Sequence, residues 1–405
     1  MVARTRPPAV PSIDRVVYAD ALMADDHHHT SRRDFFRRSF GSVLAGASVF
    51  EEAFLRAGWA RAQSQTAPAN LFDIEKVADG VFAALAKPAA LTNCNAAIFV
   101  LSRDVLVVDA HSKPSAAAAL IAQIKKEVTD RPVRYLVNTH FHWDHTQGDA
   151  AYKRTNPGVQ IIASETTKQL MSQLQRDRLK ESLDSVPGLI DGAKGRLSRA
   201  KTAQERDWAN EQLRQLTAYQ AEMNKYPLEL PTVTFAKTHV IKDASGDLEL
   251  AFNGRAHTAG DIQVFSPARK IIASGDAIIG FLPNLNDGYP KTWPTTIDSV
   301  AAWKFDSIIA GHGPVQHGRN RMAQFRNYIE DLTARVEQAK KAGTPLAELQ
   351  TAITPSSLST LQIGGFGSYV ADNLAKYTVY LGNRTPLEDR LTGNIAAIYQ
   401  NLDRI

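Results

Sequence analysis

The segment 138–149 reads NTHFHWDHTQGD, and four of its side chains can bind a metal ion: His140, His142, Asp144 and His145. The run before it, 133–137, is short and mostly apolar, which is typical of a buried strand that ends at a polar loop. Because residues two apart in an extended segment point the same way, His140 and His142 can converge on one cation. As the chain turns away, Asp144 and His145 can face a second position. The motif therefore predicts a metal site carried at the end of a strand.

The donor types and their number say more about this site. Imidazole nitrogens with a single carboxylate and no thiolate suit zinc, and iron or manganese are the alternatives. Four ligands do not complete two metal positions, so we expect further ligands downstream, each at the end of an apolar run. Three residues follow a strand-like run and a small residue: His257 in GRAHTAGD, Asp276 in IIASGDA and His312 in IIAGHG. A lone histidine at a strand end is more often an ordinary polar residue, but this ordered succession favours a metal centre.

Taken in order, HxHxDH followed by His, Asp and His resembles the metallo-β-lactamase-fold hydrolase superfamily over roughly residues 74–316. The resemblance implies two zinc ions per chain. It assigns three ligands to each ion: His140, His142 and His257 to the first, and Asp144, His145 and His312 to the second. Asp276 would bridge the two ions. Asp109, at an earlier strand end, would support the metal loop without binding metal.

The same resemblance implies an α/β fold, the αββα four-layer sandwich, in which two sheets are flanked by helices. The pattern of the chain agrees, since the segment 115–128 reads as a helix that returns the chain to a parallel strand. The metallo-β-lactamase-fold domain would span residues 63–405. Within it, about 165–230 predicts an inserted helical hairpin with a break at Pro187-Gly188, and about 319–405 predicts C-terminal helices. We expect the hairpin either to roof the active site or to form a homodimer surface.

The resemblance also implies an enzyme, a metallo-hydrolase in which a metal-bound hydroxide attacks a small-molecule ester, lactone, thioester or β-lactam carbonyl. Asp144 would be catalytic, since it would orient the hydroxide and pass its proton to the leaving group. An aspartate at position 276 resembles the glyoxalase II and lactonase branches, because the true β-lactamases have Cys or Ser there. Asp261 and Gln147 stand where those branches commonly have His and Gly, so the branch stays open.

Two other functions remain compatible with this ligand set. Persulfide dioxygenases share it but use one iron, which would replace hydrolysis by oxygen chemistry. A periplasmic protein that binds metal or handles a cofactor without turnover would also keep the ligands, although the intact Asp144 argues against it.

The first 62 residues resemble a twin-arginine signal peptide. Ser31-Arg32-Arg33-Asp34-Phe35-Phe36 precedes a weakly apolar stretch at 41–50, and Ala60-Arg61-Ala62 forms an A-x-A cleavage site. The stretch is too short to span a bilayer, so we expect no membrane association after cleavage. The twin-arginine export machinery would deliver a folded, metal-loaded protein to the periplasm. The start is either Met1 or Met23, and the alternative to a signal is an amphipathic helix with an incidental arginine pair.

Composition sets the remaining limits. The 405 residues are 44% apolar, enough to bury a sizeable core. The net charge is +5, but Lys and Arg are interspersed with Asp and Glu, which argues against nucleic-acid binding. Cys94 is the only cysteine, which rules out an intramolecular disulfide, and its apolar context predicts a core position.

Overall fold

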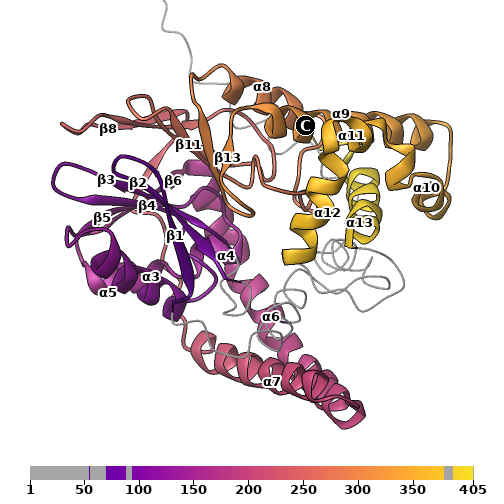
Figure 1. The fold of residues 1–405 in the computed structure, drawn as a ribbon, viewed down its shortest axis with the longest axis horizontal. Helices are drawn as coiled ribbons and strands as arrows, with labels where there is room; N and C mark the ends of the chain where they lie inside the picture. Colours follow the sequence, from indigo (N-terminus) through magenta and orange to yellow (C-terminus); the bar gives the residue numbers. More distant parts are fainter. Residues whose placement is uncertain (1–53, 55–69, 88–93, 378–385, 405) are drawn as a thin grey trace, which may run out of the picture. The chain divides into compact units, whose positions relative to one another are not determined.

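Two β-sheets organise the part of the chain that the computed structural model describes, which is residue 54 and residues 70–87, 94–377 and 386–404 (Figure 1). The first sheet runs in sequence order: β1 (Phe72–Ala78), β2 (Val81–Ala86), β3 (Ala96–Val100), β4 (Val105–Val108), β5 (Val133–Val137), β6 (Gln160–Ser164) and β7 (Val233–Phe235). The second runs in reverse order: β13 (Gln316–His317), β12 (Ser307–Ala310), β11 (Ile271–Gly275), β10 (Ile262–Ser266), β9 (Leu248–Phe252) and β8 (Thr238–Ile241).

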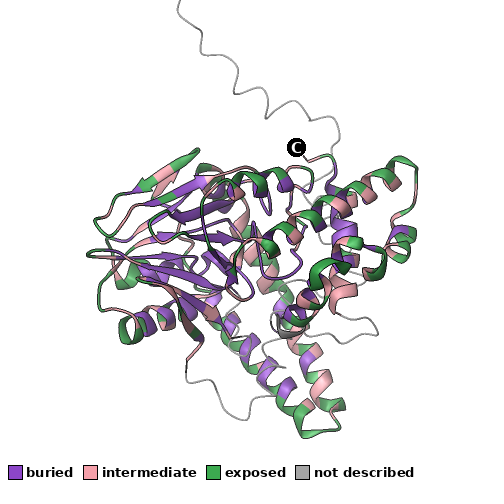
Figure 2. Ribbon diagram, turned by 45° about the horizontal axis from the view of Figure 1, so that its top comes forward, coloured by how far each residue is buried: buried purple, intermediate pink, exposed green. Residues whose placement is uncertain are grey.

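The central core lies between the two sheets. Phe99 and Val108 of the first sheet and Leu250, Val264 and Ile309 of the second belong to one buried apolar cluster. Their strands are mostly apolar, which suits a pleated surface covered on both faces. Figure 2 shows both sheets largely buried. Burial of this apolar area is the main favourable contribution to folding.

Helices cover the outer faces of both sheets. On the first sheet, α3 (Pro114–Glu127) and α5 (Asp149–Thr155) bury residues such as Leu120 and Tyr152 against the strands. On the second, α8 (Trp293–Ala301) and α9 (Asn320–Lys341) contribute Ile297 and Phe325 to a large apolar cluster. The order is therefore helix, sheet, sheet, helix, and the αββα prediction is confirmed.

Further helices continue the outer cluster after α9. They are α10 (Leu346–Ala352), α11 (Ser359–Gln362), α12 (Phe366–Tyr377) and α13 (Pro386–Asn401), with short 3₁₀ turns at Pro355–Ser357 and Ile363–Gly365. Leu349, Val370 and Ile395 bury their side chains in the same cluster as the second sheet. The C-terminal helices thus extend the layer that covers this sheet.

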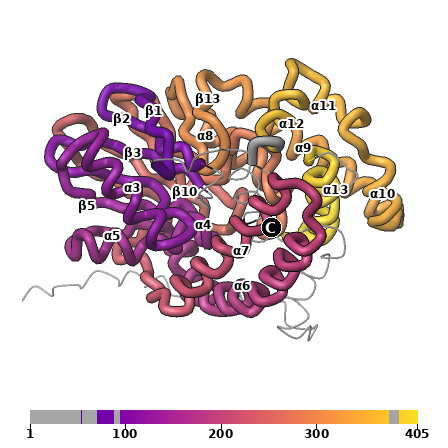
Figure 3. Tube along the Cα trace, turned by 60° about the horizontal axis from the view of Figure 1, so that its bottom comes forward, coloured from indigo at the N-terminus to yellow at the C-terminus, as the bar shows by residue number. Residues whose placement is uncertain are grey.

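The helical insertion is a hairpin of α6 (Glu165–Arg199) and α7 (Ala203–Met223), which lie side by side in Figures 1 and 3. The predicted break at Pro187-Gly188 is wrong, because α6 continues through Pro187. Apolar residues on both sides of the proline share one cluster with α7: Leu179, Leu183, Val186, Leu189, Ile190 and Ala193. This packing outweighs the lost backbone hydrogen bond. The chain reverses at Thr202 instead, where a capping box with Glu205 starts α7.

The expected leader, residues 1–62, lies outside the described residues except for Phe54. Phe54 is buried and meets Tyr219 of α7 edge-on, with ring centroids 5.3 Å apart. None of the helices in the described ranges combines the length and the apolar composition that a membrane span requires.

Candidate metal centre

Parallel pairing of neighbouring strands brings the predicted ligands to one edge of each sheet. In the first sheet, β4 and β5 are parallel, with Val108 opposite Val137. In the second, β11 and β12 are parallel, with Gly275 opposite Ala310. Because parallel strands end at the same edge, the loops that follow them converge. Six of the ligand residues follow directly, in the loop after β5, in α4 (Trp143–Thr146) and after β11 and β12. The seventh, His257, follows β9, and because β9 and β11 both pair antiparallel with β10, these two strands end at the same edge.

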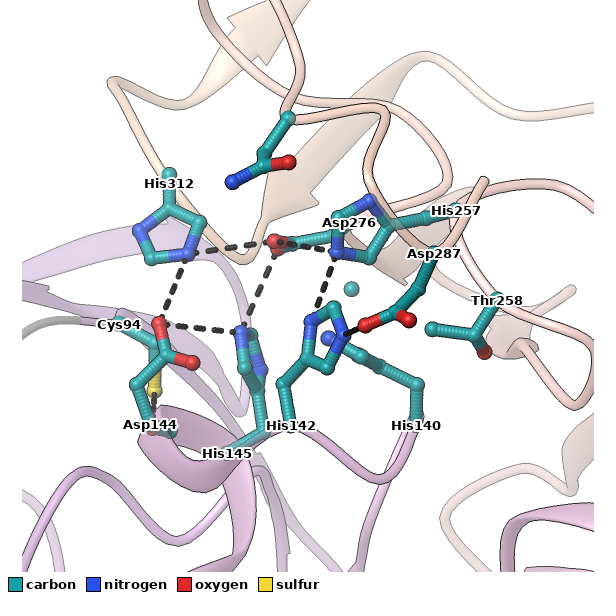
Figure 4. Close-up of polar contacts among 12 residues, drawn as sticks. Cys94, His140, His142, Asp144, His145, His257, Thr258, Asp276, Asp287 and His312 are labelled. Atoms are coloured by element: carbon teal, nitrogen blue, oxygen red, sulfur yellow. Dashed lines mark hydrogen bonds and ion pairs between the residues drawn. The ribbon is translucent and has the colours of Figure 1, made fainter. Parts of the chain in front are cut away.

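The seven predicted ligands come together in three overlapping groups (Figure 4). Within each group the donor atoms lie within 4.8 Å of one another: His140, His142 and His257; His140, His145 and Asp276; and Asp144, His145 and His312. The first group is a three-imidazole site. The last group is a mixed site, with one carboxylate and two imidazoles.

Asp276 joins the two sites. Its Oδ2 lies 3.5 Å from Nε2 of His257 and 3.3 Å from Nε2 of His312. Its Oδ1 lies 3.5 Å from Nε2 of His145. A Cβ on Gly311 would lie 2.2 Å from that Oδ1, so only glycine fits beside the carboxylate. The Asp276 carboxylate therefore lies between residues of the first and last groups.

The histidine rings are oriented through their outward-facing nitrogens. Nδ1 of His145 donates to Oδ2 of Asp109 at 2.9 Å. The hydroxyl proton of Thr139 goes to Asp109, so its oxygen accepts from Nδ1 of His140 at 3.0 Å. Among the described residues, Nε2 of His140 and Nε2 of His145 are buried without a hydrogen-bond partner. Buried ring nitrogens of this kind are atoms that a metal ion would satisfy.

Asp109 occupies the supporting position that the resemblance implies. Its Oδ1 accepts from the backbone N–H of Thr139 at 2.9 Å, and its Oδ2 accepts from His145. Its φ of 70° lies in the left-handed region, which aspartate tolerates better than most residues. Asp109 therefore ties together the beginning and the end of the metal loop.

Electrostatics divides the two sites. Burial lowers the pKa of His257 to about 3, and burial with neighbouring His145 lowers that of His140, so both rings are neutral at physiological pH. Burial also lowers the pKa of His312, but the nearby carboxylates of Asp276 and Asp144 have the larger effect and raise this pKa to about 9. Burial would raise the pKa of Asp144, yet His145 and His312 hold it below its usual range. Neutral imidazoles and ionised carboxylates are the forms that bind cations.

Two functional candidates were missed by sequence reasoning. Oδ2 of Asp287, in the loop before α8, accepts from Nε2 of His142 at 2.8 Å (Figure 4). Arg178 of α6 donates to both oxygens of Asp287, at 2.8 and 2.9 Å. The only signal for Asp287 was its acidic side chain within the segment 281–293, which follows Asp276 and is rich in aromatic residues and proline. Nothing in the sequence distinguished Arg178 from the other arginines of a charged helix.

The residues that depart from the glyoxalase II and lactonase pattern have structural roles here. Oε1 of Gln147 accepts from the hydroxyl of Tyr219 at 3.0 Å, which joins the metal loop to α7. The glycine that follows is required, because a Cβ on Gly148 would lie 1.8 Å from the carbonyl oxygen of Ala110. Asp261 is buried and accepts from the N–H and hydroxyl of Thr258, which closes the loop after His257. Asp261 therefore braces the loop from outside the three ligand groups.

Cys94 has the core position that its context predicts. It is fully buried, and its thiol donates to the backbone oxygen of Asp144 at 2.8 Å. Burial raises the pKa of this thiol well above its usual value, so it stays protonated.

Two comparisons with known proteins, one by structure and one by sequence family, bear on the identity of the chain. Among solved structures, the chain is similar to a metallo-beta-lactamase from Pontibacter korlensis, with 18% identity, a TM-score of 0.46, and coverage of 64% of this chain and 99% of that one. A metallo-beta-lactamase from Hirschia baltica has 17% identity and a TM-score of 0.44, with 64% and 97% covered. FIM-1 from Pseudomonas aeruginosa, in a mono-zinc form, has 18% identity and a TM-score of 0.44, with 65% and 97% covered. The sequence model of the metallo-beta-lactamase superfamily matches residues 90–306, more than half of the chain. The protein belongs to the metallo-beta-lactamase superfamily.

Proposed function

We propose that this protein is a metal-dependent hydrolase with two zinc ions, acting on the carbonyl of a small-molecule ester, lactone, thioester or β-lactam. The position of Asp276 carries the proposal. One of its oxygens lies within 3.5 Å of His257 and within 3.3 Å of His312, which belong to different ligand groups. A carboxylate shared in this way suits two metal ions a few Å apart, the arrangement of many binuclear hydrolases.

The donor set fits zinc. His140, His142 and His257 offer three imidazole nitrogens. The group of Asp144, His145 and His312 adds two more imidazoles and a carboxylate. No thiolate takes part, since Cys94 is protonated and turned toward a backbone oxygen. Zinc accepts nitrogen and carboxylate ligands, and catalytic zinc sites typically keep one position for water. Bound zinc would supply Lewis acidity and lower the pKa of a coordinated water from about 15.7 to about 7.

Asp144 is the residue we assign to proton transfer. Its Oδ2 lies 3.2 Å from Nε2 of His312 and 3.6 Å from Nε2 of His145. Because these histidines keep its pKa low, the carboxylate is ionised at neutral pH and can accept a proton from the attacking water. It can then return that proton to the leaving group. The bridging aspartate favours a substrate of the thioesterase or lactonase type.

Metal content and turnover, measured on the same preparation, test this proposal. Protein purified without chelator or added metal is analysed by mass spectrometry and assayed on a lactone, a thioester and a β-lactam. We expect two zinc ions per chain and hydrolysis of at least one substrate. His140→Ala should lose zinc and activity, whereas His317→Ala, an exposed histidine on β13, should retain both.

Other outcomes identify the alternatives. One iron per chain, with oxygen uptake on a persulfide, would replace the hydrolase by a dioxygenase. Bound metal without turnover on any of these substrates would favour a non-catalytic metal-binding role.

We also propose that the protein is exported to the periplasm by the twin-arginine route. The support is the Arg32-Arg33 pair, the apolar stretch after it and the A-x-A site at Ala60-Arg61-Ala62. A metal centre assembled from two sheets agrees with export in the folded state.

A further inference from the structure

Helix α6 contacts the loop that carries His257. The hydroxyls of Ser164 and Thr167, at the start of the helix, both donate to the backbone oxygen of Gly260, at 2.7 and 2.9 Å. Ser164 also caps the helix by accepting from the N–H of Thr167. A Cβ on Gly260 would lie within 2.9 Å of both residues, so the loop and the helix are in close contact.

The middle of the same helix contacts the HxHxDH loop. Nε2 of Gln175 donates to the backbone oxygen of Phe141 at 2.9 Å and to the hydroxyl of Thr146 at 2.6 Å. One turn later, the guanidinium of Arg178 lies over the ring of Phe141, 4.8 Å from its centroid. Residues three apart share a helix face, so both side chains reach the loop together. Phe141 itself lies between two ligands, His140 and His142.

Arg178 also holds the carboxylate that contacts His142. Its two terminal nitrogens bind the two oxygens of Asp287, and one of these oxygens accepts from Nε2 of His142. The three side chains are partly buried, with exposed fractions of 26%, 23% and 18%. A bidentate arginine fixes both the position and the plane of a carboxylate, which a lysine cannot do. With its Nε2–H donated to Asp287, His142 presents Nδ1 to the centre, 3.0 Å from Nε2 of His257.

We propose that Arg178 is a positioning residue for the three-imidazole site, acting through Asp287 on the tautomer and orientation of His142. The inference rests on the proposed function to the extent that this site binds a metal ion. The other site is oriented differently, since His145 is held by Asp109 of the first sheet. Loss of Arg178 therefore affects one site and spares the other. The helical insertion is in this respect part of the metal centre.

Stepwise removal of zinc separates the two sites. Zinc-loaded wild-type protein and variants are titrated with a chromophoric chelator, and zinc release is followed as a function of chelator concentration. We expect two steps for the wild type. Arg178→Ala should shift one step by about 10- to 100-fold toward weaker binding and leave the other unchanged. Arg176→Ala, an exposed arginine on the same helix, should shift neither.

Two more variants exclude a merely structural effect. Arg178→Lys keeps the charge but loses the fork, so it should give a smaller shift of the same step. Asp287→Asn should shift that step too, and the double variant Arg178→Ala/Asp287→Asn should lose no more than the worse single variant. If circular dichroism shows that Arg178→Ala does not fold, the test uses Arg178→Lys and Asp287→Asn instead.

Each remaining result overturns the inference. Equal shifts of both steps by Arg178→Ala would indicate general destabilisation, and additive losses in the double variant would show that Arg178 does not act through Asp287. If the wild type releases zinc in two steps and Arg178→Ala shifts neither step, the inference about Arg178 is wrong but the proposed function stands. A wild-type protein that binds no zinc would overturn the proposed function as well.

Discussion

Nδ1 of His145 donates to Oδ2 of Asp109 across 2.9 Å, and both side chains are almost completely buried. The bond holds the imidazole proton on Nδ1 and turns Nε2 toward Asp144 and Asp276. Asp109 also accepts from the N–H of Thr139, which precedes the first ligand of the loop. One carboxylate therefore determines the geometry at both ends of the HxHxDH segment.

Asp109→Asn should weaken zinc binding by about 10- to 100-fold. An amide has one accepting oxygen, so either His145 or the N–H of Thr139 would lose its acceptor. The left-handed backbone at 109 is compatible with asparagine, so the change should leave the loop path intact. Chelator competition measures the affinity, and Asp130→Asn, at an exposed position, is the control. Unchanged zinc affinity in Asp109→Asn would refute the role given to this residue.

The fold and the approach of the ligands were predictable because short apolar runs end within three residues of a His or Asp. The runs before Asn138, Asp276 and His312 are β5, β11 and β12, and their parallel pairing follows from the crossover connections. The partners of the ligands were harder to predict. Asp287 and Arg178 are 109 residues apart in the chain, and only the packing of α6 against the loops brings them together.

Local signals also misplaced the reversal of the hairpin. Proline followed by glycine usually ends a helix, but in α6 the apolar face on both sides of Pro187 packs on the same surface of α7. Tertiary packing therefore decided the path of the chain. The role of Gln147 was hidden for a similar reason, because its partner Tyr219 lies on the insertion.

Replacement of Arg32-Arg33 by Lys-Lys should block export of a reporter fused to residues 1–62. The twin-arginine pathway reads the arginine pair itself, whereas a simple positive charge would be kept by lysine. The segment offers a matched control, since Arg37-Arg38 lies five residues further on. Lys-Lys at those positions should leave export intact. Cell fractionation with a reporter that is active only in the periplasm measures both, and export of the Arg32-Arg33 variant would contradict the assignment.

The metal-free protein should lose stability as the pH rises from about 7 to about 9. Asp276 and Asp144 raise the folded-state pKa of His312 from 6.5 to about 9 against the effect of burial. The protonated ring therefore stabilises the folded state fully below about pH 6.5, and this contribution is lost as the pH passes through about 9. The melting temperature of chelator-treated protein should fall across this range, and less so in His312→Gln.

The stabilisation of the protein by zinc should depend on pH in the opposite direction. The ion must displace the proton of His312, so the rise in melting temperature on adding zinc should grow with pH over the same interval. A metal-free wild type with the same pH profile as His312→Gln would contradict the coupling of His312 to the two carboxylates.

Gly311→Ala should remove metal while leaving the fold in place. The new Cβ would lie 2.2 Å from Oδ1 of Asp276 and 2.9 Å from Cε1 of His145, closer than real contacts allow. The Asp276 side chain is almost completely buried, so it has no room to move away without leaving its place between His257 and His312. We expect at least one zinc ion to be lost, with an overpacking cost of about 1–3 kcal/mol in the free energy of unfolding.

Gly393→Ala is the matched control, because a Cβ there, on α13, meets nothing within 4 Å. Its zinc content should equal that of the wild type, and its unfolding free energy should rise by up to about 1 kcal/mol. If Gly311→Ala bound two zinc ions with wild-type affinity, the proposed bridging position of the Asp276 carboxylate, next to residue 311, would be wrong.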